Sequence, residues 1–228
     1  MRKYFVLFMI LGACWWGCDE NEIAIYQETP RLNFYYSGGV VFVDTDYVKQ
    51  HTEKELIVVI ALQGEPLEEG RTFCVTAQPA DSVTEMTDVV LADSYVFPAG
   101  KYRDSIRVTV RRPSRPTLTT PQTRASLAFD PSNPAHEFEP GKIEDQNYTI
   151  DASFYLPRPM SWNSSFWGLY STAKYMFMMD CLGNSFQDSW NNWERVNEVR
   201  LAYEEYCADP AHEELLDDEG NPIVFPKN

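Results

Sequence analysis

The sequence predicts a mainly β protein, in which an immunoglobulin-like antiparallel β-sandwich is followed by a smaller α-helical or mixed C-terminal region. Two observations lead to this prediction. Short β-branched and aromatic runs, separated by turn residues, fill residues 30–157. From Met160 onward the composition changes, and within the C-terminal region 158–228 apolar residues recur at helical spacing from Trp190 to Tyr206. The length of 228 residues leaves room for one large domain or two small ones.

Eight runs are the expected strands, which is enough for two sheets. They are Leu32–Tyr36, Val40–Val43, Leu56–Leu62, Thr72–Ala77, Val89–Phe97, Ser105–Val110, Ala125–Phe129 and Tyr148–Leu156. Ile106, Val108 and Val110 alternate with polar residues, which indicates one buried and one solvated face. The run 56–62 is apolar on both faces, so we expect it at the centre of a sheet. No helix-length pattern separates the strands, which argues against a parallel α/β fold.

The C-terminal region is predicted to hold two helices and a closing strand. Ser171 is the expected N-cap of a first helix that ends at Gly183, although a strand is the competing interpretation of the apolar run 174–179. Ser189 is the expected N-cap of a second helix, whose apolar stripe contains Trp190, Trp193, Val196, Val199, Tyr203 and Tyr206. Residues 215–225 read as a turn that leads into the strand.

Residues 1–17 have the form of an export signal. Arg2 and Lys3 precede a short apolar run, which is shorter than the roughly 20 residues that a membrane-spanning helix needs. Cys18 follows small residues and precedes three carboxylates in residues 19–22. This arrangement resembles the lipobox of bacterial lipoproteins, in which the cysteine is acylated; Cys14 is the alternative attachment site. Residues 18–29 would then form an acidic tether. An ordinary secretory signal with an incidental cysteine is the other interpretation.

Charge and cysteine content restrict the partners further. The chain has 34 acidic and 19 basic residues and a net charge of −15, which repels phosphate backbones, so we expect no nucleic-acid partner. Cys74, Cys181 and Cys207 show no metal-ligand spacing, and we expect neither a metal nor a cofactor. We interpret these cysteines as small buried hydrophobic residues, with a Cys181–Cys207 disulfide as the alternative.

No catalytic motif is found in the sequence, which predicts a protein that is not an enzyme. His51, His136 and His212 are the only imidazoles, and we interpret them as solvated surface residues. No nucleophile elbow and no catalytic cysteine context occurs. The acids of residues 44–46 and 217–219 do not fit a calcium-binding loop, and we interpret them as solvated turn residues.

The candidate ligand-binding or partner-binding residues are four tryptophans in the last third of the chain, Trp162, Trp167, Trp190 and Trp193. Exposed indole rings present flat apolar faces with a polar edge to a ligand or a protein. The alternative is that they fill the interface between the helices and the sandwich, which the helical spacing of Trp190 and Trp193 favours.

Several short motifs together resemble one family. They are the lipobox and the segments Ile25–Tyr26, Pro30–Phe34, Phe97–Lys101, Val108–Arg112, Trp167–Ser171, Lys174–Tyr175 and Ile223–Pro226. In this order they resemble the surface lipoproteins of Bacteroidota catalogued as domain of unknown function 4843. No catalytic residue is assigned in that family, so none is transferred.

The resemblance implies a lipid-anchored protein on the surface of the bacterial outer membrane, often encoded beside SusC/SusD-like importers of nutrients. It therefore implies a non-catalytic accessory subunit that binds a glycan or oligopeptide or docks on the importer. A surface hydrolase of the same polymers, or a structural envelope lipoprotein, is the alternative.

Overall fold

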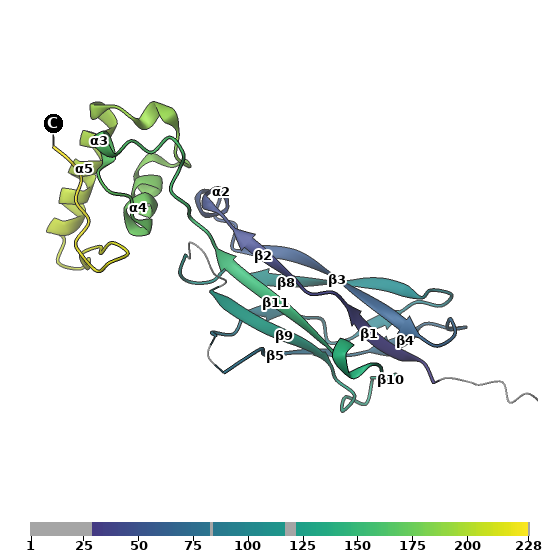
Figure 1. Cartoon of the computed structure of the whole chain (residues 1–228). Coiled ribbons are helices and arrows are strands. Elements are labelled where there is room, and N and C mark those ends of the chain that lie inside the picture. Colours follow the sequence, from purple (N-terminus) through teal and green to yellow (C-terminus); the bar gives the residue numbers. More distant parts are fainter. Residues whose placement is uncertain (1–28, 83, 117–121, 228) are drawn as a thin grey trace, which may run out of the picture.

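The structure, a computed structural model, describes residues 29–82, 84–116 and 122–227. The expected lipid attachment sites Cys18 and Cys14, the signal peptide and nearly all of the acidic tether lie outside the described residues. The described chain is mainly β, as predicted, and its strands form two stacked sheets with a helical region at one end (Figure 1).

The sandwich consists of a five-stranded and a four-stranded sheet, with a two-stranded sheet beside them. The five-stranded sheet has the order β10 (Glu139–Pro140), β1 (Arg31–Tyr35), β3 (Glu53–Gln63), β8 (Arg103–Arg111), β6 (Val89–Val90). The four-stranded sheet has the order β2 (Gly38–Phe42), β11 (Asn147–Phe154), β9 (Thr123–Phe129), β5 (Val75–Pro79), and the small sheet pairs β4 (Arg71–Phe73) with β7 (Tyr95–Phe97). A short 3₁₀ turn, η2 (Ile143–Asp145), precedes β11.

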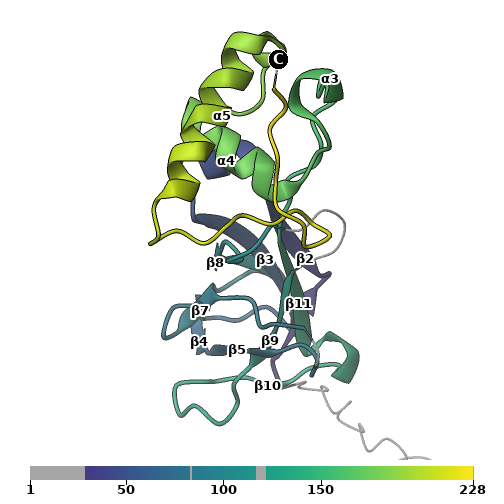
Figure 2. The same ribbon diagram turned by 90° about the vertical axis from the view of Figure 1, so that its left-hand side faces the viewer.

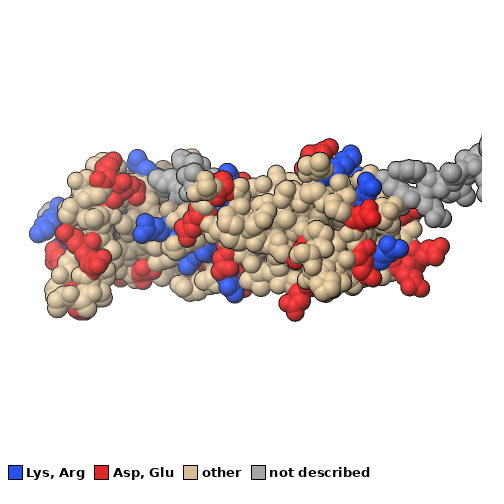
Figure 3. All heavy atoms as spheres, turned by 90° about the horizontal axis from the view of Figure 1, so that it is seen from below, with Lys and Arg blue, Asp and Glu red and all other residues tan. Residues whose placement is uncertain are grey.

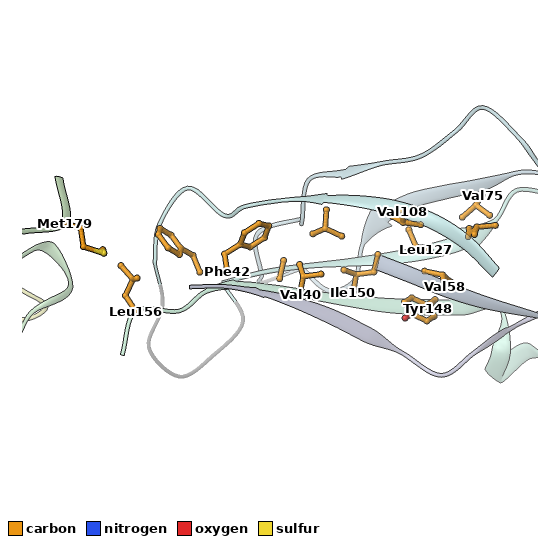
Figure 4. Packing of buried hydrophobic residues seen from close by; sticks show 14 of the residues in the cluster. Val40, Phe42, Val58, Val75, Val108, Leu127, Tyr148, Ile150, Leu156 and Met179 are labelled. Carbon is orange, nitrogen blue, oxygen red and sulfur yellow. The ribbon is translucent and has the colours of Figure 1, made fainter. Parts of the chain in front are cut away.

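The core of the sandwich lies between the two large sheets, where inward side chains of facing strands meet (Figure 4). Val58 and Val108 of one sheet and Leu127 and Ile150 of the other are fully buried. Burying one such side chain contributes about 1.5–3 kcal/mol. The predicted alternation along β8 is confirmed, and β3 lies centrally between β1 and β8. Ile57 on the outer face of β3 is nevertheless 60% exposed, so only one face of this strand is in the core.

Two of the expected strands are each divided between sheets. The run 72–77 breaks at Cys74, because its N–H donates to His136 Nδ1 (3.1 Å) and its carbonyl accepts from Asp130 N (2.9 Å), outside the strand ladders. The run 89–97 breaks after β6, where residues 91–94 lie outside any strand and separate β6 in the large sheet from β7 in the small one. The single strands predicted for both runs are therefore wrong.

The sandwich is not purely antiparallel, which corrects the prediction. β1 pairs in parallel with β10, and β2 pairs in parallel with β11, while the other strand pairs are antiparallel. The chain passes from one sheet to the other between β1 and β2, where Tyr36 adopts a left-handed backbone (φ 71°). Gly39 is required in β2, because a Cβ there would clash with the carbonyl oxygen of Asp151 on β11.

The helical region contains α3 (Ser164–Trp167), α4 (Thr172–Leu182), the 3₁₀ turn η3 (Asp188–Trp190) and α5 (Trp193–Ala208). The helix predicted from Ser171 to Gly183 is confirmed, including its N-cap and its left-handed C-cap glycine (φ 65°). The second helix begins later than predicted. Asn192, not Ser189, is its N-cap and accepts a hydrogen bond from Arg195 N (3.0 Å), so Trp190 lies in the preceding 3₁₀ turn.

The C-terminal tail forms no closing strand within the described residues, contrary to the prediction. Leu216 and Pro222 form an isolated bridge, and the following residues lie against the helices. Ile223 and Phe225 are both 4% exposed, and the Phe225 ring contacts Trp167, Phe177 and Tyr203. Side-chain packing, rather than strand pairing, therefore holds the tail in place.

The helical region sits on the end of the sandwich that carries the short helix α2 (Asp44–Val48) (Figures 1 and 2). Tyr175 Oη donates to Asp44 Oδ2 (2.7 Å), and Tyr47 Oη donates to Asp180 Oδ1 (2.8 Å). Buried Met179 belongs to the same hydrophobic core as the sandwich residues (Figure 4). The described chain starts at the opposite end of the sandwich (Figures 1 and 2). On the face shown in Figure 3, acidic side chains lie near both ends of the molecule.

Candidate functional site

A cleft of about 570 Å³ opens in the helical region between the α3–α4 turn and the C-terminal tail. One wall comes from the turn and the start of α4, and the other comes from the acidic turn and the end of the tail. The lining residues are Arg158, Gly168, Leu169, Tyr170, Ser171, Lys174, Asp217, Asp218, Glu219, Pro222, Ile223, Val224 and Pro226. The cleft therefore combines two cationic side chains, three carboxylates and an apolar rim.

Lys174 is the buried cation of this cleft. It lies in the first turn of α4, where its backbone N–H donates to the N-cap Ser171 Oγ (3.3 Å), and the residue is 5% exposed. Its Nζ donates to the carbonyl oxygens of Leu169 (2.8 Å) and Trp167 (3.2 Å), and lies 5.6 Å from the centre of the Phe225 ring. Burial lowers the pKa of Lys174 to about 8, although the charge of Asp217 acts in the opposite direction.

The turn before α4 is shaped by Gly168. This residue has φ 71° and ψ −156°, a backbone region that only glycine adopts without strain. Its carbonyl accepts a hydrogen bond from Trp162 Nε1 (3.0 Å), which fixes the peptide between the two carbonyls that hold Lys174. The main chain around Gly168 is thus shaped to receive the lysine.

The opposite wall carries the acidic turn, residues 217–219. Asp217 Oδ1 accepts hydrogen bonds from the backbone N–H groups of Asn221 (2.7 Å) and Glu219 (3.0 Å), and these bonds lower the pKa of the Asp217 carboxyl. Both carboxylate oxygens of Asp218 lie 3.3 Å from the backbone nitrogen of Thr172, the first residue of α4. The fold therefore uses these two acids to shape the turn and to fasten it to α4, as well as to line the cleft.

The four candidate tryptophans lie in the core of the helical region or at its edge. Trp162, Trp167 and Trp190 are 4%, 0% and 5% exposed, and Trp193 is partly buried against Phe166. Their neighbours are mostly aromatic residues of the helical region itself. Trp162, Trp167 and Trp190 present no open ring face to a ligand, which corrects that expectation. Their ring contacts are with aromatic residues of the helical region, and they belong to the hydrophobic cluster that also includes sandwich residues.

The cysteines and histidines are separate from this cleft. Cys181 and Cys207 are both free, so the alternative of a disulfide between them is wrong. Cys74 is buried and Cys181 is partly buried, but Cys207 is exposed, so its interpretation as a buried hydrophobic residue is wrong. His51 and His212 are exposed as expected, but His136 is half-buried, and burial lowers its pKa.

The acids considered for calcium have other partners. Asp44 accepts from Tyr175, and Asp46 forms an ion pair with Lys54 Nζ (2.6 Å). Among the residues that the structure describes, no group of three His, Cys, Asp or Glu side chains is placed to hold a metal ion.

Comparisons with known proteins give the family but no activity. The sequence profile of a family described as "Domain of unknown function (DUF4843)" matches residues 29–184. The chain belongs to this family. The family match spans the whole sandwich together with α3, α4 and Lys174, and it ends before the acidic turn of the cleft. No curated protein matches the chain.

Several solved structures are similar in fold, at low identity. The apo-form Calx CBD1 domain is 15% identical with a TM-score of 0.34, and the match covers 55% of this chain and 99% of that domain. Two proteins of unknown function from Bacteroides ovatus are 9% and 10% identical, each with a TM-score of 0.37. These matches cover 53% and 56% of this chain but only 43% and 47% of the two proteins.

Sequence reasoning missed Lys174 and Arg158 as site residues. The signal for Lys174 was present, because it is the one basic residue in the helix from 172 to 182 and stands next to the apolar run Tyr175–Met179. A charge at such a position is buried once the helix packs, and a buried charge needs partners. Arg158 gave no comparable signal.

Within the described residues no helix is long and apolar enough to cross a membrane.

Proposed function

We propose that this protein is a lipid-anchored protein on the surface of the bacterial outer membrane, and a non-catalytic accessory subunit of a SusC/SusD-like importer. In this role it holds a glycan or an oligopeptide in the cleft beside α4 and docks on the importer. The observation that supports the proposal is the position of the cleft, which lies in the helical region, at the end of the sandwich opposite residue 29. Acylation of Cys18 would anchor the chain near that opposite end and leave the cleft away from the membrane.

The chemistry of the cleft favours binding over catalysis. Lys174 donates to two main-chain carbonyls, Asp217 accepts from its own turn, and Asp218 approaches the start of α4. Side chains held in this way form a rigid wall that is organised before a ligand arrives. The volume of about 570 Å³ suits a ligand of a few sugar or amino-acid units.

The anchor is tested on the native protein. Mass spectrometry of the N-terminus should find a diacylglyceryl group on Cys18, and a mild-detergent pull-down should recover importer subunits. An unmodified N-terminus would remove the anchor, and a pull-down without importer subunits would remove the docking role.

Ligand binding is tested with panels of glycans and oligopeptides. The wild-type protein should bind members of one panel without releasing products. A Leu169→Glu substitution at the exposed rim of the cleft (81% exposed) should abolish binding, while Ile143→Glu at an equally exposed site on the sandwich (88%) should leave it unchanged. Product release would favour the hydrolase instead, and failure to bind either panel would overturn the binding role.

A further inference from the structure

We propose that the cleft beside α4 recognises a carboxylate group, which binds the ammonium of Lys174 at the wall and the guanidinium of Arg158 at the rim. This inference rests on the proposed ligand-binding function and narrows the ligand to one that carries a carboxylate. Three features of the cleft support it: the contacts of Lys174, the hydrogen bonds of the acids, and the polarity of the remaining lining.

Lys174 is a buried charge whose contacts leave it incomplete. An ammonium has three N–H donors, and those of Lys174 have two carbonyl acceptors, the oxygens of Leu169 and Trp167. In the described part of the chain no carboxylate lies within 4.0 Å of its Nζ; the charge of Asp217 acts on it from a greater distance, and the Phe225 ring centre lies 5.6 Å away. A buried charge is stabilised by an opposite charge with a hydrogen bond, and this lysine lines an open cleft. A ligand carboxylate supplies the missing partner.

Arg158 adds a second cation on the same cleft. Its side chain is exposed, and Nη2 donates to Trp162 O (3.2 Å), which holds the guanidinium near the start of α3. Arginine presents five N–H donors in a fork that matches a carboxylate. One cation is thus buried and the other is accessible from solvent.

The three acids of the cleft limit the ligand to few negative charges. Asp217 and Asp218 accept backbone N–H groups, and Glu219 adds a third negative charge on that wall. These oxygens attract hydroxyl or amide N–H donors and repel further anionic groups. The lining therefore fits a ligand with one carboxylate and neutral polar groups elsewhere. Both an oligopeptide with its C-terminal carboxylate and an oligosaccharide with one uronic acid have this chemistry.

Two matched ligand pairs test the inference and distinguish the two sources. Calorimetric titration of the full chain would compare trialanine with trialanine amide, and cellobiouronic acid with cellobiose. In one pair, the carboxylate-bearing member should bind about tenfold or more tightly than its neutral partner. The pair that shows the preference identifies the source.

Substitutions then assign the preference to the cleft. Lys174→Met should abolish the preference, and Arg158→Gln should weaken it, while Lys142→Met at an exposed site on the sandwich should leave it unchanged. Asp217→Asn keeps an oxygen acceptor for the turn and should strengthen carboxylate binding.

Because Lys174→Met removes two hydrogen bonds and can impair folding, a pH series on the wild-type protein provides a second test. The charged and titratable groups that line the cleft with Lys174 are Arg158, Tyr170 and the three acids of residues 217–219. Lys174, whose pKa is lowered to about 8, loses its proton between pH 7 and 9.5, whereas burial raises the pKa of Tyr170 above this range. The carboxylate preference should therefore decline over that interval.

The outcomes separate this inference from the proposed function. Equal binding of both members of each pair, or a preference that is independent of pH and of Lys174, overturns the carboxylate subsite but leaves ligand binding intact. Failure of all four ligands and of both panels overturns both.

Discussion

The hydrogen bonds of Tyr175 predict how strongly the helical region is held to the sandwich. The side chain is fully buried, and its hydroxyl donates to Asp44 Oδ2 of α2 (2.7 Å) and accepts from Phe186 N (3.0 Å). A Tyr175→Phe substitution removes both bonds and leaves the ring contacts in place. The bond to a carboxylate is worth about 1.5–3 kcal/mol and the bond from the amide about 1 kcal/mol. We therefore expect a loss of about 3 kcal/mol in the free energy of unfolding.

Urea denaturation provides the assay. In a chain lacking Trp15 and Trp16, the tryptophan fluorescence reports on the helical region, because the other four tryptophans lie there. Circular dichroism of the strands reports on the sandwich. Tyr36→Phe removes an exposed hydroxyl, which donates to Tyr35 Oη (3.1 Å), and should change stability by less than about 0.5 kcal/mol. A loss below about 1 kcal/mol for Tyr175→Phe, at unchanged denaturant slope, would refute the reasoning.

Three further predictions concern the tail and the cleft. Phe225→Ala should lower the free energy of unfolding by about 3–5 kcal/mol, because it removes a buried ring that contacts three other aromatic rings. Val224→Ala, at a neighbouring residue that is 69% exposed, should lower it by less than about 0.5 kcal/mol. Urea titrations that gave similar values for both variants would contradict the packing of the tail. Gly168→Ala should lower stability by about 1–3 kcal/mol in thermal unfolding, because of its backbone conformation, and an unchanged Tm would count against that conformation. Burial lowers the pKa of Lys174 from 10.5 to about 8, so the folded state releases this proton at a lower pH than the unfolded state, and stability rises with pH in between. Relative to Lys174→Met, the wild type should gain roughly 2 kcal/mol between pH 7.5 and 9.5, and a flat difference would contradict the burial of this charge.

The features that the sequence predicted correctly depend on local patterns. The alternation of Ile106, Val108 and Val110 identified β8, and Ser171 and Gly183 marked both ends of α4, because caps and periodicity act within a few residues. The misplaced elements depend on distant partners. Cys74 leaves the strand ladder because of His136 and Asp130, and the cap of α5 moves to Asn192 although Ser189 is also a good capping residue.

The cleft could not be predicted for the same reason. Lys174 and the acidic turn are more than 40 residues apart in the chain, and the packing of Phe225 brings the tail back across α4. No periodicity in the sequence encodes that return. The tryptophans were prominent by composition, but most of them are in the interior, where large aromatic residues are used to fill volume.

The length of the sandwich sets the distance between the start of the described chain and the helical region. β3 has 11 residues, which at about 3.3 Å per residue extend roughly 36 Å, slightly more than the hydrocarbon thickness of a bilayer. The described chain begins at one end of the sandwich, and the helical region lies at the other end. In the lipid-anchored form proposed above, a change in the number of residues between Cys18 and β1 would alter the distance between the membrane and the helical region, and it would leave the contacts inside that region unchanged.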